Sequence, residues 1–242
     1  MNATVVVAEF ASPRVSTLVS GVFPRGAVAI ELRGAADPAL AHPDEVRSCA
    51  GFAAKRTKDF LAGRACARHA LHAFGIEGFA LGSNPDRSAS WPAGFAGSLT
   101  HTAGFSAAVV APQTAVTGIG IDAEIVSSVS IDLWPSILTP AEYAVAATWS
   151  PERRQRYAAV VFSAKESFYK CQSPLTGAWL DFLDVVVNVR FDTNTDTSGR
   201  FSIAPPAACG RTFAARPLTG RFRIEDDLVV TGITYRRLAA VS

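Results

Sequence analysis

The sequence predicts an α+β fold built from two similar halves, each combining strands with helix. Two observations predict it. Strand-like apolar runs alternate with helical patterns, and the order strands, helix, strands is followed by strand, helices, strands. We place the N-terminal half at residues 1–113 and the C-terminal half at residues 114–242.

The N-terminal half is expected to open with strands at residues 4–8 and 28–32, because both runs are apolar and the second follows a turn. A single helical pattern covers residues 43–74, and Gly75 supplies its stop. Residues 83–97 are rich in Gly, Pro and Ser, which predicts a loop.

Two strands, at residues 105–111 and 116–125, are expected to meet where the halves join. The Thr-Pro at 139–140 and the Ser-Pro at 150–151 each combine an N-cap with a proline at the first helical position. The second of these helices should run to about residue 170, and the tail beyond it is mostly strand.

The bulk composition favours a folded protein with a local rather than a general charge. The chain has 242 residues, is 49% hydrophobic and carries a formal net charge of +2. This charge is too small to predict a nucleic acid or a membrane surface as partner. Four cysteines without a CxxC pair, and an N-terminus without a basic segment, lead us to expect reduced thiols and a cytoplasmic protein.

The strand at 116–125 carries the first candidate site. Side chains alternate between the two faces of a strand, so Asp122 and Glu124 point the same way, beside Gly118 and Gly120, which leave room. An isolated Asp-x-Glu is also typical of a strand with a solvated acidic end.

The helix that follows favours a functional site over a solvated acidic end. Lys165, Glu166 and Lys170 are the only charged residues between Arg156 and Asp181, on an otherwise apolar helix. Glu166 and Lys170 are i and i+4 neighbours, which is also typical of a surface ion pair. Three carboxylates suit a hard divalent cation such as Mg²⁺, and lysines beside one indicate a phosphate ligand. The two segments together predict phosphoryl-transfer chemistry.

Basic residues of the N-terminal half form the second candidate set. Arg56 and Arg64 lie about two helical turns apart, so one side of a helix can present both to phosphate, although a solvated basic face explains them equally well. Thr100 and His101 are expected in a tight loop, where functional side chains are common, although a lone His is more often structural.

Three segments, in this order, resemble the motifs of the Sfp/EntD-like 4'-phosphopantetheinyl transferases. They are residues 97–101 (Gly-Ser-Leu-Thr-His), 118–124 (Gly-Ile-Gly-Ile-Asp-Ala-Glu) and 162–170 (Phe-Ser-Ala-Lys-Glu-Ser-Phe-Tyr-Lys). Residues 55–68 resemble the arginine-rich helix of the EntD-like branch. The resemblance covers roughly residues 43–190, and the combination of motifs is far more specific than any one of them.

The resemblance implies two α/β halves related by a pseudo-twofold, with coenzyme A in the cleft between them. It implies transfer of the phosphopantetheine arm to a serine of an acyl or peptidyl carrier protein, with release of adenosine 3',5'-bisphosphate. Fatty-acid, polyketide, non-ribosomal peptide and siderophore carriers all remain open as acceptors. A monomer is expected, because one chain supplies both halves.

By the same matching, Asp122, Glu124 and Glu166 are expected to hold Mg²⁺, with Mn²⁺ as the alternative. Glu166 would accept the proton of the carrier serine, and Lys170 would stabilise or protonate the leaving phosphate. The residues expected to contact coenzyme A, mainly through its phosphates, are Arg56, Arg64, Arg87, Thr100, His101, Lys165 and Lys170. Arg87 is included because some relatives have a lysine near Ser83 and this chain does not.

Two other functions also account for part of this pattern. A Mg²⁺-dependent hydrolase of a nucleotide or phosphate ester needs the acids and the basic residues but no protein acceptor. A non-catalytic coenzyme A or nucleotide-binding module is the other alternative, but it has no need to keep Asp122, Glu124, Glu166 and Lys170 together.

Overall fold

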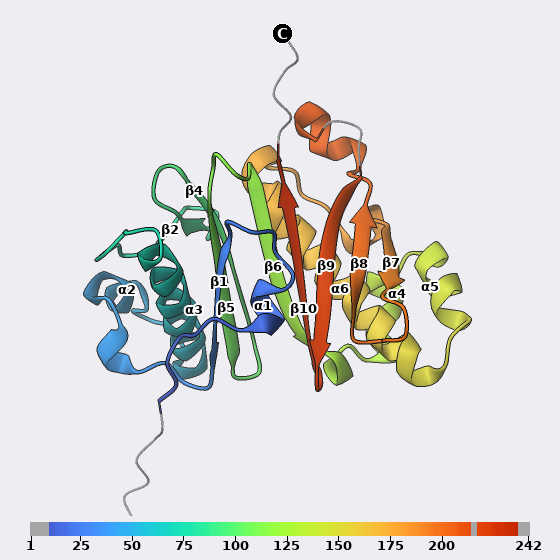
Figure 1. Cartoon of the computed structure of the whole chain (residues 1–242), viewed down its shortest axis with the longest axis horizontal. Coiled ribbons are helices and arrows are strands. Elements are labelled where there is room, and N and C mark those ends of the chain that lie inside the picture. The colour runs from blue at the N-terminus through green and yellow to red at the C-terminus, as the bar shows by residue number, and fades with distance from the viewer. Residues whose placement is uncertain (1–9, 214–216, 237–242) are drawn as a thin grey trace, which may run out of the picture.

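The computed structural model describes residues 10–213 and 217–236 and has two layered halves side by side (Figure 1). The strand predicted at residues 4–8 lies outside the described residues. The α-helices are α1 (Thr17–Ser20), α2 (Pro43–Ser48), α3 (Ala54–His72), α4 (Trp134–Ile137), α5 (Pro140–Ala147) and α6 (Pro151–Thr176). The 3-10 helices are η1 (Pro38–Leu40), η2 (Val126–Ser128), η3 (Ile131–Leu133), η4 (Phe182–Asp184) and η5 (Ala207–Thr212).

Within the described residues, the strands form three antiparallel sheets. The bounds are β1 (Val28–Arg33), β2 (Gly82–Ser83), β3 (Ala89–Ser90), β4 (Phe95–Thr102), β5 (Phe105–Pro112), β6 (Gly118–Ile125), β7 (Val187–Phe191), β8 (Ser198–Ile203), β9 (Leu218–Glu225) and β10 (Leu228–Tyr235). The strand orders are β1-β5-β4, β6-β10-β9-β8-β7 and β2-β3.

The N-terminal half packs α3 against one face of its three-stranded sheet. The contact side of α3 is made of small residues such as Cys66 and Ala67, which lets the helix lie close to Ile30 and Val110. The single helix predicted at 43–74 is wrong, because the chain breaks between α2 and α3, where Gly51 has φ +85°.

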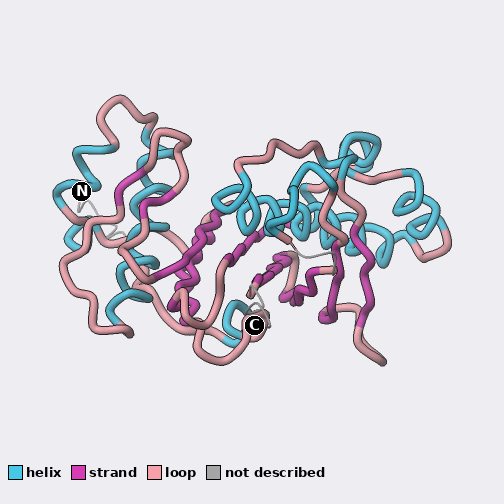
Figure 2. The backbone as a smooth tube through the Cα atoms, turned by 90° about the horizontal axis from the view of Figure 1, so that it is seen from above, coloured by secondary structure: helices cyan, strands magenta, loops and turns pink. Residues whose placement is uncertain are grey.

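The C-terminal half packs α6 against its five-stranded sheet over a core that includes Phe168, Phe201 and Phe222. Figure 2 shows its helices gathered along one face of the strands. The short helix α1 contributes Leu18 to a second cluster, with Val230 of β10. The α+β prediction is confirmed, since each half places a long helix on an antiparallel sheet.

Helix α6 begins as predicted, with the Ser150 side chain accepting from the Arg153 N–H. It ends at Thr176, six residues beyond the predicted end, with Gly177 at φ +65°. Pro174 lies inside the last turn, where it has no N–H to donate to Lys170 O, and Ser173 O accepts from Gly177 N at 2.9 Å.

The two large sheets meet at β4 and β6, which are edge strands of different sheets (Figure 1). Side-chain hydroxyls bridge them. Ser98 Oγ accepts from Ile121 N at 3.2 Å, and Thr100 Oγ1 accepts from Ala123 N at 3.0 Å. These two edge N–H groups of β6 are therefore satisfied by side chains of β4 without a backbone ladder.

All four cysteines, at positions 49, 66, 171 and 209, are buried free thiols, as expected. Within residues 10–213 and 217–236, no helix has the length and hydropathy needed to cross a membrane.

Candidate active site

The acid-bearing strand β6 faces helix α6. An added Cβ at Gly120 would lie 1.9 Å from the carbonyl oxygen of Ser167, and one at Gly118 would lie 2.9 Å from that of Cys171. The room that these glycines leave is therefore filled by the backbone of α6. This close approach sets Glu166 and Lys170 beside the acids of β6.

Asp122 is the centre of the arrangement, and it is 2% exposed. Its Oδ1 accepts from Lys170 Nζ at 2.6 Å and from Thr100 Oγ1 at 3.2 Å. Its Oδ2 is buried and has no hydrogen-bond partner. An unpartnered carboxylate oxygen in the interior is costly, and a bound cation would satisfy it.

The neighbouring glutamates respond to the same crowding of negative charge. Burial, the Asp122 charge and the Glu166 charge raise the pKa of Glu124 from 4.5 to about 7, against the opposing effect of Lys170. Burial raises the pKa of Glu166 as well, and Asp122 adds to this while Lys170 opposes it. A divalent cation would reverse these shifts by favouring the ionised acids.

No three acidic, His or Cys side chains converge closely enough to form a ready metal cluster in the described part of the chain. Lys170 instead takes the place of a cation on Oδ1 of Asp122. The free Oδ2, together with the electrostatic coupling of Glu124 and Glu166 to Asp122, fits a divalent cation in chemistry and in charge.

Thr100 and His101 lie on β4, so the prediction of a tight loop is wrong. The alternation of β4 separates the two side chains: Thr100 is 3% exposed and turned toward Asp122, whereas His101 is exposed near the strand end, opposite Ser106. The loop pattern at 83–97 in fact contains the β2–β3 hairpin and the start of β4.

Arg56 and Arg64 both lie on α3, as predicted, in different environments. Arg56 is exposed, with its guanidinium carbon 4.4 Å from the centre of the Phe52 ring. Arg64 is buried over the Phe60 ring at 3.9 Å, and burial lowers its pKa.

The β2–β3 hairpin is tied to Arg64. The Arg64 guanidinium donates to Leu81 O at 3.3 Å and to Ser83 Oγ at 3.0 Å. The side chain at position 83 is thus a hydrogen-bond partner of Arg64. Arg87 lies in the turn of this hairpin, exposed and with φ +68°.

Lys165 departs from its predicted place along a pyrophosphate. Its side chain is 1% exposed, and its ammonium donates to Glu142 Oε2, Ile137 O and Phe182 O. All three donors are used inside the protein, so that prediction does not fit this structure. The sequence did not reveal the partners of Glu142 or Ser98, because those partners are distant in the chain.

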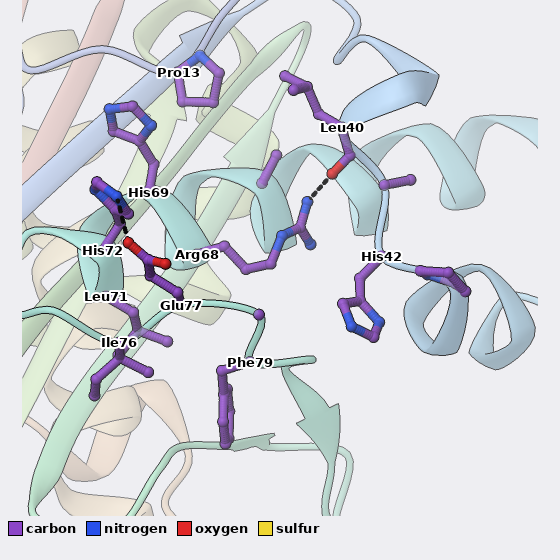
Figure 3. Close-up of a pocket in the computed structure, with 14 residues that line it drawn as sticks. Pro13, Leu40, His42, Arg68, His69, Leu71, His72, Ile76, Glu77 and Phe79 are labelled. Atoms are coloured by element: carbon purple, nitrogen blue, oxygen red, sulfur yellow. Dashed lines mark hydrogen bonds and ion pairs between the residues drawn. The ribbon is translucent and has the colours of Figure 1, made fainter.

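A cavity of about 590 Å³ lies elsewhere in the N-terminal half, among Leu40, Arg68, His69, Leu71 and Phe79 (Figure 3). It shares no residue with the acid cluster, and its charged groups are paired. Arg68 donates to Glu45 and to Leu40 O, and His72 Nε2 lies 3.4 Å from Glu77.

Comparison with known proteins gives consistent matches along most of the chain. Residues 44–111 match the family model of the 4'-phosphopantetheinyl transferase N-terminal domain, and residues 118–227 match that of the 4'-phosphopantetheinyl transferase superfamily. The chain is 36% identical over 194 residues to 4'-phosphopantetheinyl transferase PptT of Mycobacterium tuberculosis, covering 79% of this chain and 84% of that protein.

Two further relatives extend the match. 4'-Phosphopantetheinyl transferase Npt of Nocardia iowensis is 31% identical over 224 residues, which is 90% of this chain and 100% of the relative. Enterobactin synthase component D of Salmonella typhi is 35% identical over 136 residues, which is 55% of this chain and 54% of the relative. The three predicted motifs fall within the matched domains, and the chain belongs to the Sfp/EntD-like 4'-phosphopantetheinyl transferase family.

Proposed function

We propose that this protein transfers the 4'-phosphopantetheine arm of coenzyme A to a serine of an acyl or peptidyl carrier protein and releases adenosine 3',5'-bisphosphate. The observation that carries the proposal is the buried network in which Asp122 meets Lys170 and Thr100, with Glu124 and Glu166 beside it. Membership of the transferase family gives this network its chemistry.

We assign Asp122, Glu124 and Glu166 to Mg²⁺, with Mn²⁺ as the alternative. The free Oδ2 of Asp122 and the raised pKa values of the two glutamates support this assignment. Bound there, the cation would stabilise negative charge on the pyrophosphate of coenzyme A.

Glu166 is our candidate for the general base. It lies on α6 beside Asp122 and Lys170, so its carboxylate could accept the proton of the carrier serine directly or through a water held by the cation. Lys170 is our candidate for the residue that stabilises or protonates the leaving phosphate. Its side chain is 28% exposed, so its ammonium can approach the departing phosphate oxygen, stabilise the charge there and supply a proton.

The N-terminal half is assigned to coenzyme A. Arg56, Arg64, Arg87 and His101 lie on α3, on the β2–β3 turn and on β4, and Thr100 links that half to Asp122. Arginine suits phosphate because its planar fork can bind two oxygens.

We also propose that the chain divides between residues 113 and 114, and that a pseudo-twofold relates the two halves. The change of sheet between β5 and β6 supports the division.

The proposal also includes the oligomeric state, the cellular location and the acceptor proteins. We expect a monomer, because one chain carries both the arginine helix and the acids. We expect it in the cytoplasm, because its four cysteines are free thiols. Siderophore, polyketide and non-ribosomal peptide carriers are the first acceptors to test, given the match to enterobactin synthase component D.

Intact-mass spectrometry of an apo carrier protein incubated with this protein, coenzyme A and MgCl2 tests the proposal. A mass gain of one phosphopantetheine that is lost with EDTA is the expected result, and Glu166→Gln should abolish it while leaving the fold intact. Near-normal turnover by that variant would contradict the base assignment. Breakdown of coenzyme A without carrier modification would indicate the hydrolase, and intact coenzyme A without modification a binding module.

A further inference from the structure

A buried ion pair lies one residue before Glu166 on the catalytic helix. The Lys165 ammonium donates to Glu142 Oε2 at 2.7 Å, to Ile137 O at 2.8 Å and to Phe182 O at 2.9 Å. The two side chains are 1% and 2% exposed, and burial lowers the pKa of Lys165. An ammonium has three N–H donors, so none is left for a ligand.

Glu142 is equally engaged. Its Oε2 also accepts from Thr139 N at 2.7 Å, as part of the capping box of α5, and its Oε1 accepts from Val187 N at 2.7 Å. The pair therefore connects α6 to the end of α4, the start of α5, η4 and the start of β7. These contacts come from residues 137–187, so they fix α6 against several elements at once.

Because Lys165 lies on a helix, the ion pair with Glu142 also determines which way the neighbouring side chains of α6 point. Consecutive residues on an α-helix are about 100° apart around its axis. With Lys165 held toward α4, α5 and η4, the next residue, Glu166, is turned toward the acid strand, and Lys170 follows one turn later to meet Asp122 at 2.6 Å. On the other side, Gly120 fixes how closely α6 approaches β6.

We propose that Lys165 and Glu142 are positioning residues, which together set the rotation of α6 and so place Glu166 and Lys170 at Asp122. Lys165 makes no contact with coenzyme A in this proposal, which rests on the transferase function proposed above. A contact with pyrophosphate would require Lys165 to leave three acceptors and would leave the Glu142 carboxylate buried without its counter-charge.

The test compares Lys165→Met, Glu142→Gln and the double variant with the wild type, run alongside in the carrier-modification assay. Positioning predicts that each single variant lowers kcat about tenfold or more, whereas KM for coenzyme A changes less than about threefold. The double variant should lower kcat by about as much as either single variant and no further, because the two residues act as one unit. Glu152→Gln, on the exposed first turn of α6, is the matched control and should leave kcat and KM unchanged.

A direct contact gives a different pattern. Lys165→Met would then raise KM for coenzyme A about tenfold or more, Glu142→Gln would not, and the double variant would show the summed effect. Either that pattern or a double variant with wild-type kcat overturns the proposal. If the single variants do not fold, the double variant, which leaves no unpaired buried charge, supplies the same split of kcat and KM. A wild-type protein that modifies no carrier would refute the transferase function itself, which is a separate outcome.

Discussion

Lys170 Nζ lies 2.6 Å from Asp122 Oδ1, and this ion pair joins α6 to β6 across 48 residues of sequence. The two partners are unequally buried, because the Lys170 side chain is 28% exposed and that of Asp122 is 3% exposed. Asp122 therefore depends on Lys170 for its counter-charge in the absence of a cation, whereas Lys170 has access to solvent.

Lys170→Met should destabilise the metal-free protein by about 2 kcal/mol, less than the roughly 3–5 kcal/mol for breaking a fully buried pair. MgCl2 should then raise the Tm of the variant more than that of the wild type, because a cation would restore the missing positive charge. Thermal unfolding with and without MgCl2 measures both effects. An equal Tm rise in both proteins would contradict the assignment of Asp122 to the cation.

The titration of Glu124 should make the free energy of unfolding depend on pH. Its pKa is raised from 4.5 to about 7 in the folded protein, so between these values the folded state binds more protons than the unfolded state. The free energy of unfolding of the metal-free protein should therefore fall as the pH rises through this range and level off above it. Urea unfolding at pH 5 to 8 should show a shallower fall for Glu124→Gln, and identical slopes would contradict the prediction.

Gly120→Ala should be strongly destabilising. Its Cβ would lie 1.9 Å from the backbone oxygen of Ser167, so α6 must move away from β6, at a cost of about 3 kcal/mol. The rate of carrier modification should also fall, because Glu166 and Lys170 lie on α6 and would move away from Asp122 with it.

Gly63→Ala is the matched control for Gly120→Ala. Gly63 lies inside α3, and its added Cβ would meet only Leu99 Cδ2, at an ordinary 3.9 Å. A helix-favouring residue there should stabilise the protein by about 0.5–1 kcal/mol. Equal losses in both variants, measured by urea unfolding, would show that the α6 contact is not the cause.

Variants of Arg56 and Arg64 should show that coenzyme A binding and protein stability depend differently on the two arginines of α3. Arg56→Ala should raise KM for coenzyme A about tenfold, the loss of one good phosphate contact, with little change in Tm. Arg64→Ala should raise KM and also lower Tm, because Arg64 is buried over Phe60 and bonded to Ser83. Lys58→Ala, an exposed cation on the same helix, is the control. An unchanged KM in Arg56→Ala would remove Arg56 from the site.

Arg87→Gly should stabilise the hairpin turn while weakening coenzyme A binding. The φ of +68° is a left-handed conformation that costs a side-chain-bearing residue about 1 kcal/mol and costs glycine little. A gain in unfolding free energy with a raised KM would indicate that Arg87 is kept for its charge. A gain with unchanged KM would exclude it as a coenzyme A contact.

Local periodicity was enough to predict part of the site. The twofold alternation of a strand places Asp122 and Glu124 on one face, and the i, i+4 spacing of a helix places Glu166 beside Lys170. Both relations are properties of a few consecutive residues, so they are readable without the fold. The structure then adds the meeting of Lys170 with Asp122.

What sequence could not predict depends on distant partners. Lys165 carries the same charge as Lys170 five residues away, and only the position of Glu142, 23 residues upstream, turns it inward. The space beside Gly120 looked open because nothing local reveals that α6 fills it. The break between α2 and α3 was missed for a local reason, because Gly51 was not recognised as a helix stop inside the helical pattern.

The hydroxyl bridges between β4 and β6 make two backbone amides into natural reporters of the junction between the halves. Ile121 and Ala123 donate their N–H groups to Ser98 and Thr100, and so to side chains of the other half. Their hydrogen exchange is governed by how often that junction opens, independently of the ladder that β6 forms with β10. In an isotope-enriched protein, the nuclear magnetic resonance signals of these two amides would follow the opening of this junction without any added probe group.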